Sequence, residues 1–442
     1  MNNKRTFRLS LPSLEGGVGG RSARGSVWLF LELVIITVVA WVVFDPAIVN
    51  LYYKSLPSGY DNDRLLYAET HLNRISVDGH YLVTDERKQE MIRRLESVEG
   101  IESVYVYDNN WGSIGFDNVS FYMLKKDQDT LWVPQISFIH DASFFETYGL
   151  KPLPGSPSAK ELSHIQLHSN EIVLTRSAAI SYFGTDDVVG KHVQNMVNNT
   201  LDELTVAGVV EDIRVSPARA LRSLLFSPSD LNVYDIYFAI RLKKGINPNR
   251  FVEEHGKELI AQGKTDYCRI RRLMTFNEHL QQMELDEGRP QEVNRSLTLA
   301  LFFLVNLCLA VIGTVWLQAR RKTEECGIRR AFGATRSRLL FSFLADGALM
   351  ATVAVVIGCI IFLNYAYSGY EIVNGYEDFD TMYRPEFFTP KSDLTWVEHF
   401  MPHFLIVSGV VYIIILCTVL IGTTIPALKI IGTKVTDALR DE

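Results

Sequence analysis

Two histidines and a run of glycines are the first residues of this chain whose types and spacing could do chemistry. His164 and His168, in HIQLH, share one face at this spacing, and two imidazoles on one face could ligate a metal ion. The pair is not part of a complete metal-site motif, so we interpret it as a polar surface. The glycines of GGVGG (16–20) have no strand before them and no Lys-Ser/Thr after them, so we interpret them as a flexible tail.

The sequence contains none of the motifs that would make the chain an enzyme. There is no GxxxxGK followed by Ser or Thr, so the chain cannot hold a nucleotide phosphate in that way, and there is no HExxH or GxSxG. We therefore predict no catalytic residue, no metal site and no cofactor in this chain. Catalytic groups can converge from distant positions, so a membrane-anchored enzyme or sensor remains an alternative.

Two acidic residues, Glu32 and Asp346, lie inside strongly apolar stretches. A carboxylate within a membrane is costly, so such a residue is by default a candidate for function. The alternative is hydration near the membrane surface together with hydrogen bonds to neighbouring helices. Small residues follow Asp346 at spacings of four, which lets helix backbones approach closely and favours a packed bundle or a dimer. These residues are Gly347 and Ala351, then Ala354 and Gly358.

A basic stretch, ARRKTEECGIRRAFGATRSRLL (319–340), separates two apolar stretches and carries seven Lys or Arg residues. Ile328, Ala331 and Phe332 lie at helical spacing between Gly327 and Gly333, which predicts a short amphipathic helix. Arg329 and Arg330 could make charge-assisted contacts with the acidic groups of a partner. The alternative is a topology anchor, but a turn of a few residues would be enough to join two neighbouring spans.

Four stretches are apolar enough to position these residues in a membrane, where a span needs about 20 residues. They are 27–44, 297–317, 339–363 and 404–425. A cleaved signal peptide is the alternative for the first, but its apolar run is long and DPAIVN follows it in place of a clean cleavage site. The net charge of −7 argues against a nucleic-acid-binding protein.

The distribution of charge predicts which side of the membrane each segment occupies. Lys and Arg accumulate on the cytoplasmic side of spans. The N-terminal tail and the basic segment (318–338) are rich in them, whereas 364–403 is acidic. The predicted order is a cytoplasmic tail (1–26), a span (27–44), an extracytoplasmic domain (45–296), a span (297–317), the cytoplasmic basic segment, a span (339–363), an outer loop (364–403), a span (404–425) and a cytoplasmic tail (426–442).

The large domain between the first two spans reads as α+β. Helical periodicity at 85–100 precedes a strand at 101–108, and a strand (232–245), a helix (247–263) and a strand (266–276) follow later. This pattern predicts a split α+β subdomain, about 50–130 and 231–290, with a β-rich insert at about 131–230. The insert shows a strand (171–175), a helix (176–184) and a strand (203–213). Cys268 is the only cysteine here, so no internal disulfide is expected.

RKTEECGIRRAFGAT (321–335) resembles the signature of the FtsX/MacB-type permeases of ABC transporters. The correspondence falls on Arg321, Glu324, Gly327, Ile328, Arg329, Arg330, Ala331, Gly333 and Ala334, with a mild departure at Glu325-Cys326. Segments 140–155, 170–193, 204–213 and 426–442 also resemble the family, as does the order of spans. In the family the matching segment meets the ATPase subunit.

The resemblance implies a bacterial inner-membrane permease subunit, with a MacB-like periplasmic core domain, for export or substrate handling in the envelope. Its partners would be an ABC ATPase that holds ATP and Mg²⁺, a second permease subunit, identical or paralogous, membrane lipids and, in some assemblies, a periplasmic adaptor protein; nucleic acid is not expected. The alternative within the superfamily is an ATP-driven scaffold that regulates a cell-wall hydrolase. No stretch of the sequence specifies the substrate.

Overall fold

The computed structural model describes residues 20–72, 76–77, 80–81, 84–107, 113–115, 120–126, 129–140, 142–166, 169–197, 200–215, 223–229, 236–286, 288–317, 326–367 and 396–432. The chain forms two compact units. The first, the helical unit, contains Met1–Pro46, Arg295–Val373 and Phe404–Glu442. The second, the α+β unit, contains Ala47–Asn294 and Asn374–His403.

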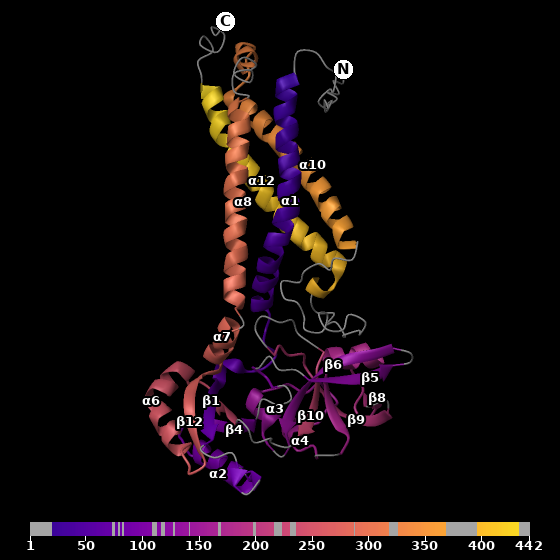
Figure 1. Cartoon of the computed structure of the whole chain (residues 1–442), viewed down its shortest axis with the longest axis vertical. Helices are drawn as coiled ribbons and strands as arrows, with labels where there is room; N and C mark the ends of the chain where they lie inside the picture. The colour runs from indigo at the N-terminus through magenta and orange to yellow at the C-terminus, as the bar shows by residue number, and fades with distance from the viewer. Residues whose placement is uncertain are drawn as a thin grey trace, which may run out of the picture. The chain divides into compact units, whose positions relative to one another are not determined.

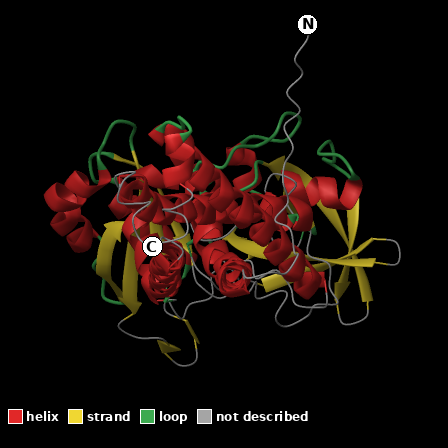
Figure 2. Cartoon of the chain, turned by 90° about the horizontal axis from the view of Figure 1, so that it is seen from above, coloured by secondary structure: helices red, strands yellow, loops and turns green. Residues whose placement is uncertain are grey.

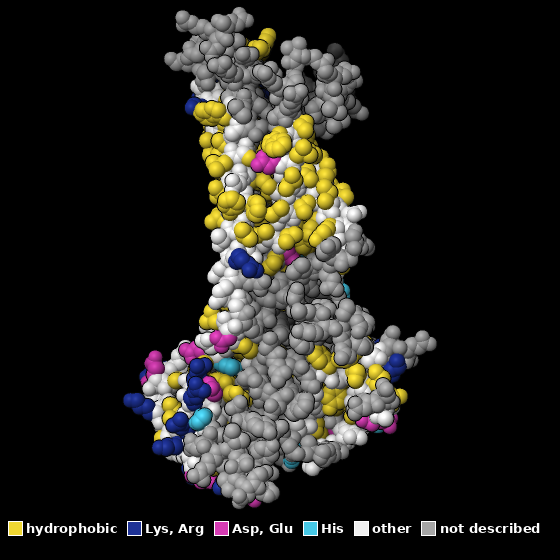
Figure 3. Space-filling view, in the orientation of Figure 1, with side chains coloured by type: hydrophobic (Ala, Val, Ile, Leu, Met, Phe, Trp, Pro, Cys, Tyr) yellow, Lys and Arg dark blue, Asp and Glu magenta, His cyan; other side chains and the backbone are white. Residues whose placement is uncertain are grey.

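Four long helices supply the membrane spans, as the sequence predicts (Figure 1). They are α1 (Gly20–Ser55), α8 (Arg289–Leu317), α10 (Arg336–Tyr367) and α12 (Phe400–Gly432). Each is long and apolar enough to cross a bilayer. A helix satisfies its backbone polar groups internally, as hydrocarbon requires. Figure 3 shows hydrophobic side chains over the visible face of these helices.

The helices run beyond the apolar stretches that reveal them in the sequence. Helix α1 continues through Asp45 and Pro46 to Ser55, and α8 begins at Arg289, eight residues before its apolar run. Hydropathy detects the part of a helix that lies in hydrocarbon, and a helix does not have to end where its apolar residues end.

Small residues and one tryptophan hold the helical unit together. The Trp41 ring in α1 stacks on Phe362 of α10 with 4.0 Å between ring centroids, and Trp41 Nε1 donates to Ser408 Oγ of α12 at 3.1 Å. A Cβ atom at Gly358 would lie 2.6 Å from Thr37 Cβ, so only glycine permits this approach of α10 to α1. A Cβ atom at Gly347 would lie 3.3 Å from Thr423 Oγ1 of α12, a tight contact but a less severe one than at Gly358.

A four-stranded antiparallel sheet forms one half of the α+β unit, in the order β12-β1-β11-β4. The strands are β1 (Leu65–Leu72), β4 (Ile101–Tyr107), β11 (Tyr237–Leu242) and β12 (Cys268–Thr275). Helices α2 (Asp85–Glu96) and α6 (Pro248–Gln262) share an apolar core with it. A polar residue caps the start of each helix. The Thr84 side chain accepts a hydrogen bond from the Arg87 amide at the start of α2, and the Asn247 side chain accepts one from the Arg250 amide at the start of α6.

A closed six-stranded barrel, in the order β10-β6-β5-β8-β9-β7, forms the other half. Its strands are β5 (Ser120–Lys126), β6 (Asp129–Ile139), β7 (Glu171–Thr175), β8 (His192–Val197), β9 (Thr200–Val210) and β10 (Leu225–Ser229). Strand β10 pairs with β6 and β7 pairs with β9 in parallel. The helix α5 (Arg176–Phe183) packs against the barrel. Figure 2 shows the strands of the sheet and of the barrel as two groups.

An aromatic core joins the sheet to the barrel. Helix α3 (Phe144–Tyr148) inserts Phe144, Phe145 and Tyr148 between Tyr105 of the sheet and Phe226 of the barrel, with ring centroids about 5–6 Å apart. The short helix α4 (Ala159–Ser163) lies beside α3. The Tyr105 hydroxyl accepts a hydrogen bond from the backbone amide of Ile139, in β6, at 2.9 Å. The two halves therefore share one core.

The remaining described elements are short or lie at the junctions with the spans. They are η1 (Asn62–Arg64), β2 (Ser76–Val77), β3 (His80–Tyr81), α7 (Phe276–Asp286) and η2 (Trp396–Glu398). Helix α7 directly precedes α8 in the chain. Within the α+β unit, Val397 packs against Val49 and Tyr53 of α1.

We expect a fragment of residues 45–294 to fold as a soluble monomer under reducing conditions. Its three apolar cores lie within the fragment, and its only cysteine, Cys268, is fully buried. Circular dichroism and size exclusion would report the fold and the size. Aggregation of the fragment in every buffer, or a need for oxidation, would contradict the assignment of an independent core.

Candidate functional site

The described part of the basic segment folds as one helical turn that ends at a glycine. Residues 326–331 are helical, and Gly333 follows with φ of 90°, a conformation that residues with a Cβ adopt at a cost. The amides of Gly333 and Ala334 donate to the carbonyls of Arg330 and Arg329, at 2.9 Å each, which closes the helix. Helix α10 then begins after Thr335, whose Oγ1 accepts from Arg338 N at 3.3 Å.

One side of this turn is fixed to the ends of two spanning helices. Cys326 is only 5% exposed and packs with Leu339 and Phe343 of α10 and Ala427 and Ile430 of α12. Arg330 Nη1 donates to the carbonyl of Ile431, near the end of α12, at 3.2 Å. A cation at the carbonyl end of a helix is favourable. A force on the turn would therefore reach α10 and α12 directly.

The opposite side of the turn presents apolar side chains among arginines. Phe332 is 89% exposed, and Ile328 is also exposed. With Arg329 and Arg338 they border a shallow hollow of about 500 Å³, which Gly333, Ala334, Leu339 and Ser342 complete. An exposed aromatic ring beside arginines has the composition of a protein-interaction hot spot.

The residues that the sequence singles out differ in how exposed they are. Arg321 and Glu324 lie outside the described residues. Gly327 is buried, whereas Ile328, Arg329, Ala331 and Gly333 are exposed and Arg330 and Ala334 are half-buried. Glu32 is half-buried in α1 and Asp346 is exposed on α10, and neither makes a hydrogen bond or ion pair with another described residue. Ala351 and Ala354 are fully buried.

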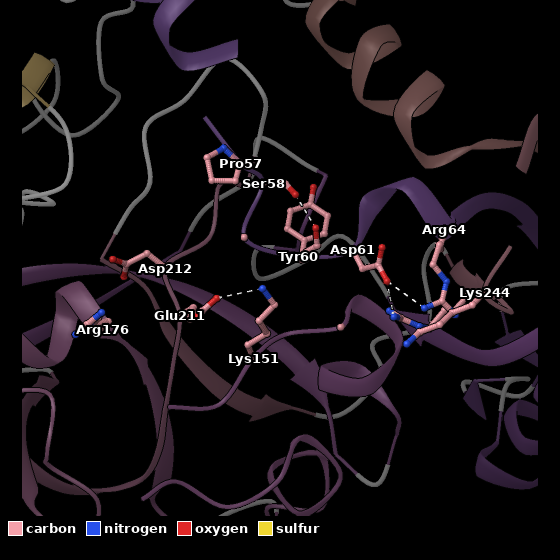
Figure 4. Close-up of a pocket in the computed structure, with 13 residues that line it drawn as sticks. Pro57, Ser58, Tyr60, Asp61, Arg64, Lys151, Arg176, Glu211, Asp212 and Lys244 are labelled. Carbon is pink, nitrogen blue, oxygen red and sulfur yellow. Dashed lines mark hydrogen bonds and ion pairs between the residues drawn. The ribbon is translucent and has the colours of Figure 1, made fainter. Parts of the chain in front are cut away.

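A second hollow, of about 630 Å³, lies in the α+β unit (Figure 4). Several of its charged groups pair with one another: Arg241 Nη2 donates to Asp61 Oδ2 at 2.6 Å, and Lys151 Nζ lies 3.6 Å from Glu211 Oε2. Asp212 accepts from the backbone amide of Ser177 at 2.9 Å, and burial raises the pKa of its carboxyl. We interpret these contacts as structural. The described residues contain no cluster of three metal-ligating side chains.

A buried arginine holds the end of α1. Arg214, which follows β9, is 7% exposed and donates to three carbonyls at the end of the helix and just beyond it: Tyr53, Leu56 and, at 3.0 Å, Pro57. Its own amide donates to Ser58 O at 2.9 Å. The last carbonyls of a helix have no partner within the helix, so the guanidinium satisfies them. Burial lowers the pKa of Arg214, but a guanidinium stays charged at neutral pH.

The segment that leads into α8 is tied to the same unit. In α7, Glu284 forms an ion pair with Lys54 of α1 at 3.5 Å, and Asn277 Oδ1 accepts from Asn62 at 2.8 Å. The His279 ring stacks on Tyr67 of β1 with 3.7 Å between centroids, and its Nε2 bonds to Gly115 O at 2.8 Å. Burial lowers the pKa of His279 to about 4, so the neutral ring donates from Nε2 to the carbonyl.

Sequence reasoning does not find Arg214, Glu284 or His279. Arg214 bonds backbone carbonyls more than 150 residues earlier in the chain, and a carbonyl leaves no signal in residue type. Phe332 shows helical spacing in the sequence, but its exposure depends on how Cys326 packs.

Comparison with known proteins gives one family. A family model described as FtsX-like permease C-terminal matches residues 297–435, which include α10, α12, the basic segment and most of α8. A crystal structure described as a permease-protein domain from Porphyromonas gingivalis is similar at 18% identity, with a TM-score of 0.30, and the match covers 49% of this chain and 93% of that chain. No curated protein matches the chain.

Replacing Arg214 with alanine should free the end of α1. The variant leaves three carbonyls without their charged donor, which costs about 2–3 kcal/mol. Hydrogen exchange in the full chain should accelerate over residues 53–58. Arg271→Ala removes an exposed ion pair with Glu69 at 3.6 Å and is the matched control, with little expected change. Equal exchange rates in both variants would contradict the role of Arg214.

His279 should make the α+β unit less stable in acid. The pKa of its ring is 6.5 when unperturbed and about 4 in the folded chain, so the unfolded state binds the proton more tightly. The stabilisation is complete above about pH 6.5, and up to about 3 kcal/mol is lost as the pH falls toward 4. Denaturant titrations of fragment 45–294 should show this loss relative to His279→Gln. A constant difference between the two proteins from pH 7 to 4 would refute it.

Proposed function

We propose that this chain, a member of the FtsX-type permease family, is the membrane subunit through which a separate ATPase moves the α+β unit. The observation that carries the proposal is the exposed turn of the basic segment, anchored on α10 and α12 and presenting Phe332 and Ile328 beside Arg329. The chain is a multi-pass membrane protein. It has no catalytic role of its own in this proposal, and ATP and Mg²⁺ bind the partner.

The chemistry of the turn defines the partner surface that would receive it. Phe332 and Ile328 need an apolar pocket, and Arg329 and Arg338 favour carboxylates at its rim. Such a pocket on an ATPase subunit would close around the turn. Because Cys326 and Arg330 hold the turn to α10 and α12, a displacement of the partner would move both helices.

Two helical connections could carry that motion to the α+β unit. The first is α1, whose end is bonded by Arg214 and by the ion pair between Lys54 and Glu284 of α7. The second is α7, which leads into α8. ATP binding has to favour one of two arrangements of these helices for the equilibrium to shift. The shared aromatic core makes the sheet and the barrel respond together.

The charge asymmetry of the sequence supports an orientation with both termini and the basic segment in the cytoplasm and the α+β unit outside, in a bacterial inner membrane. A second permease subunit and membrane lipids complete the minimal assembly, to which an adaptor protein outside the membrane could bind. The large two-part unit favours export or substrate handling in the envelope over a scaffold for a cell-wall hydrolase.

Copurification from native membranes with a Walker-type ATPase tests the proposal, and repeated absence of the ATPase from the purified chain would refute it.

Phe332→Ala should weaken binding of the ATPase without affecting the fold. Loss of a hot-spot aromatic costs about 2 kcal/mol, or roughly thirtyfold in Kd. Phe341→Ala, which removes another strongly exposed ring, 74% against 89% for Phe332, from the span of α10, is the matched control. The measurement is the amount of ATPase retained by each variant at equal chain abundance. Equal retention by both variants would exclude docking at Phe332.

Gly333→Val should uncouple ATP hydrolysis from the motion of the α+β unit. The positive φ of Gly333 strains any residue with a Cβ, so the turn changes shape while the spans insert normally. Gly432→Val, at an open position at the end of α12, is the control. Gly327, which is buried in the same turn, should respond like Gly333. Normal coupling in both Gly333→Val and Gly327→Val would count against the role of the turn.

A further inference from the structure

The second hollow, in the α+β unit, lies where three parts of that unit meet. Its wall includes residues 57–61, the connector from α1 to the sheet, together with residues of the sheet half and of the barrel half (Figure 4). A Cβ atom at Gly59 would lie 2.2 Å from Asp212 O, so the connector passes directly against the chain just beyond β9. The volume of about 630 Å³ is within the range of small-molecule pockets, roughly 300–1,000 Å³.

At one end of the hollow the charges balance except for one lysine. Asp61 Oδ2 lies 3.1 Å from Arg64 Nη1 and 2.6 Å from Arg241 Nη2. Glu102 pairs with the same two guanidinium groups. Lys244, just after β11, is exposed and makes no ion pair or hydrogen bond with another described residue. This end therefore carries one unbalanced positive charge.

Two further cations of the wall are already paired. Lys151 Nζ lies 3.6 Å from Glu211 Oε2, and both side chains belong to the wall. Arg176 Nε donates to Asp186 Oδ2 at 2.9 Å, on the outer side of the hollow. Neither pair leaves a net charge for a ligand.

Asp212 carries the unbalanced charge of opposite sign. It is 7% exposed, and its carboxylate accepts hydrogen bonds from neutral donors: the amide and hydroxyl of Ser177 and the hydroxyl of Thr175. Burial raises the pKa of this carboxyl in spite of these bonds and of the Arg176 charge, because desolvation disfavours the charged form. Its oxygens have further lone pairs, so an ammonium group could bond there without displacing Ser177.

We propose that the hollow binds a small dipolar molecule, with its ammonium group at Asp212 and its carboxylate at Lys244. Figure 4 shows Asp212 at one end of the hollow and Lys244 at the other, with Lys151 and Glu211 between them. A purely anionic or purely cationic ligand would balance one end only. The two charges of the ligand have to be several bonds apart, as in a short peptide with free termini or an ω-amino acid. An α-amino acid carries them on neighbouring atoms.

The site goes beyond the proposed function and does not depend on it. A bound molecule would join the connector after α1 to the sheet and to the barrel, because all three form the wall. The turn that presents Phe332 takes no part in the wall. Loss of binding in the hollow and loss of ATPase docking are therefore separate results.

Calorimetric titration of the full chain in lipid nanodiscs tests the charge pattern. Triglycine should bind. N-acetyltriglycine, which lacks the ammonium group, and triglycinamide, which lacks the carboxylate, should each bind about tenfold more weakly or worse. Glycine should also bind more weakly, because its charges cannot reach both ends. The dipolar ε-aminocaproate has no peptide bond: binding equal to that of triglycine assigns the site to dipolar molecules in general, and weaker binding assigns it to peptides.

Substitutions at the two ends test the residues. Lys244→Gln should weaken triglycine binding by about tenfold and leave the weaker binding of triglycinamide unchanged. Asp212→Asn keeps a carbonyl acceptor for the Ser177 amide and should weaken binding of triglycine but not of N-acetyltriglycine. Lys243→Gln, at a neighbouring exposed lysine outside the hollow, is the matched control and should bind like the unaltered chain.

Three results would each overturn the proposal: no binding of triglycine at millimolar concentration, equal binding of triglycine and its two blocked forms, or unchanged triglycine binding in Lys244→Gln. If Asp212→Asn does not fold, Lys244→Gln decides the matter, because Lys244 is exposed and its replacement removes no contact with a described residue.

Discussion

The hydrocarbon of a bilayer offers no hydrogen bonds, and this constraint accounts for most of the arrangement of the chain. Each span is one continuous helix, because a helix satisfies its backbone internally. Threonines in the spans return their hydroxyls to carbonyls four residues earlier, as Thr37 does to Leu33 at 2.7 Å. Where α1 ends, its last carbonyls again need donors, and Arg214 provides them from a segment distant in the sequence.

The exclusion of polar groups from hydrocarbon also explains why the sequence predicts the spans and the fold class. The four spans and the α+β character follow from segregated apolar runs, because hydrocarbon excludes charge. Local periodicity also locates elements well: a strand expected at 171–175 is β7 (Glu171–Thr175), and a helix expected at 247–263 is α6 (Pro248–Gln262). These segments bury one face or two, so their residue patterns carry the signal.

What the sequence does not predict depends on contacts between distant residues. The barrel closes because β10 pairs in parallel with β6, some 90 residues earlier, and no local pattern records that pairing. Strand β1 (Leu65–Leu72) lies at the centre of the sheet in a region where sequence alone shows little. Cys326 stands in a basic segment and is nevertheless buried, because the ends of α10 and α12 cover it. The exposure of Phe332 follows from that packing.

In the proposed function, a small contact surface, the turn at 326–333, transmits motion to a large rigid body, the α+β unit. The turn at 326–333 is anchored on one side and open on the other, so it can pass a displacement to α10 and α12. The α+β unit shares one aromatic core between the sheet and the barrel, so it can move as a body. Stiff elements of this kind transmit a shift without absorbing it, because packed interiors deform little.

Photo-crosslinking from position 332 in native membranes tests the central claim most directly. A photoreactive phenylalanine analogue replaces Phe332, whose ring is 89% exposed, so the probe leaves the anchored side of the turn undisturbed. The account predicts that irradiation captures a Walker-type ATPase on the cytoplasmic side, and that the same analogue at Phe341 does not. Capture of a protein from outside the membrane, or of lipid alone, from position 332 would contradict it.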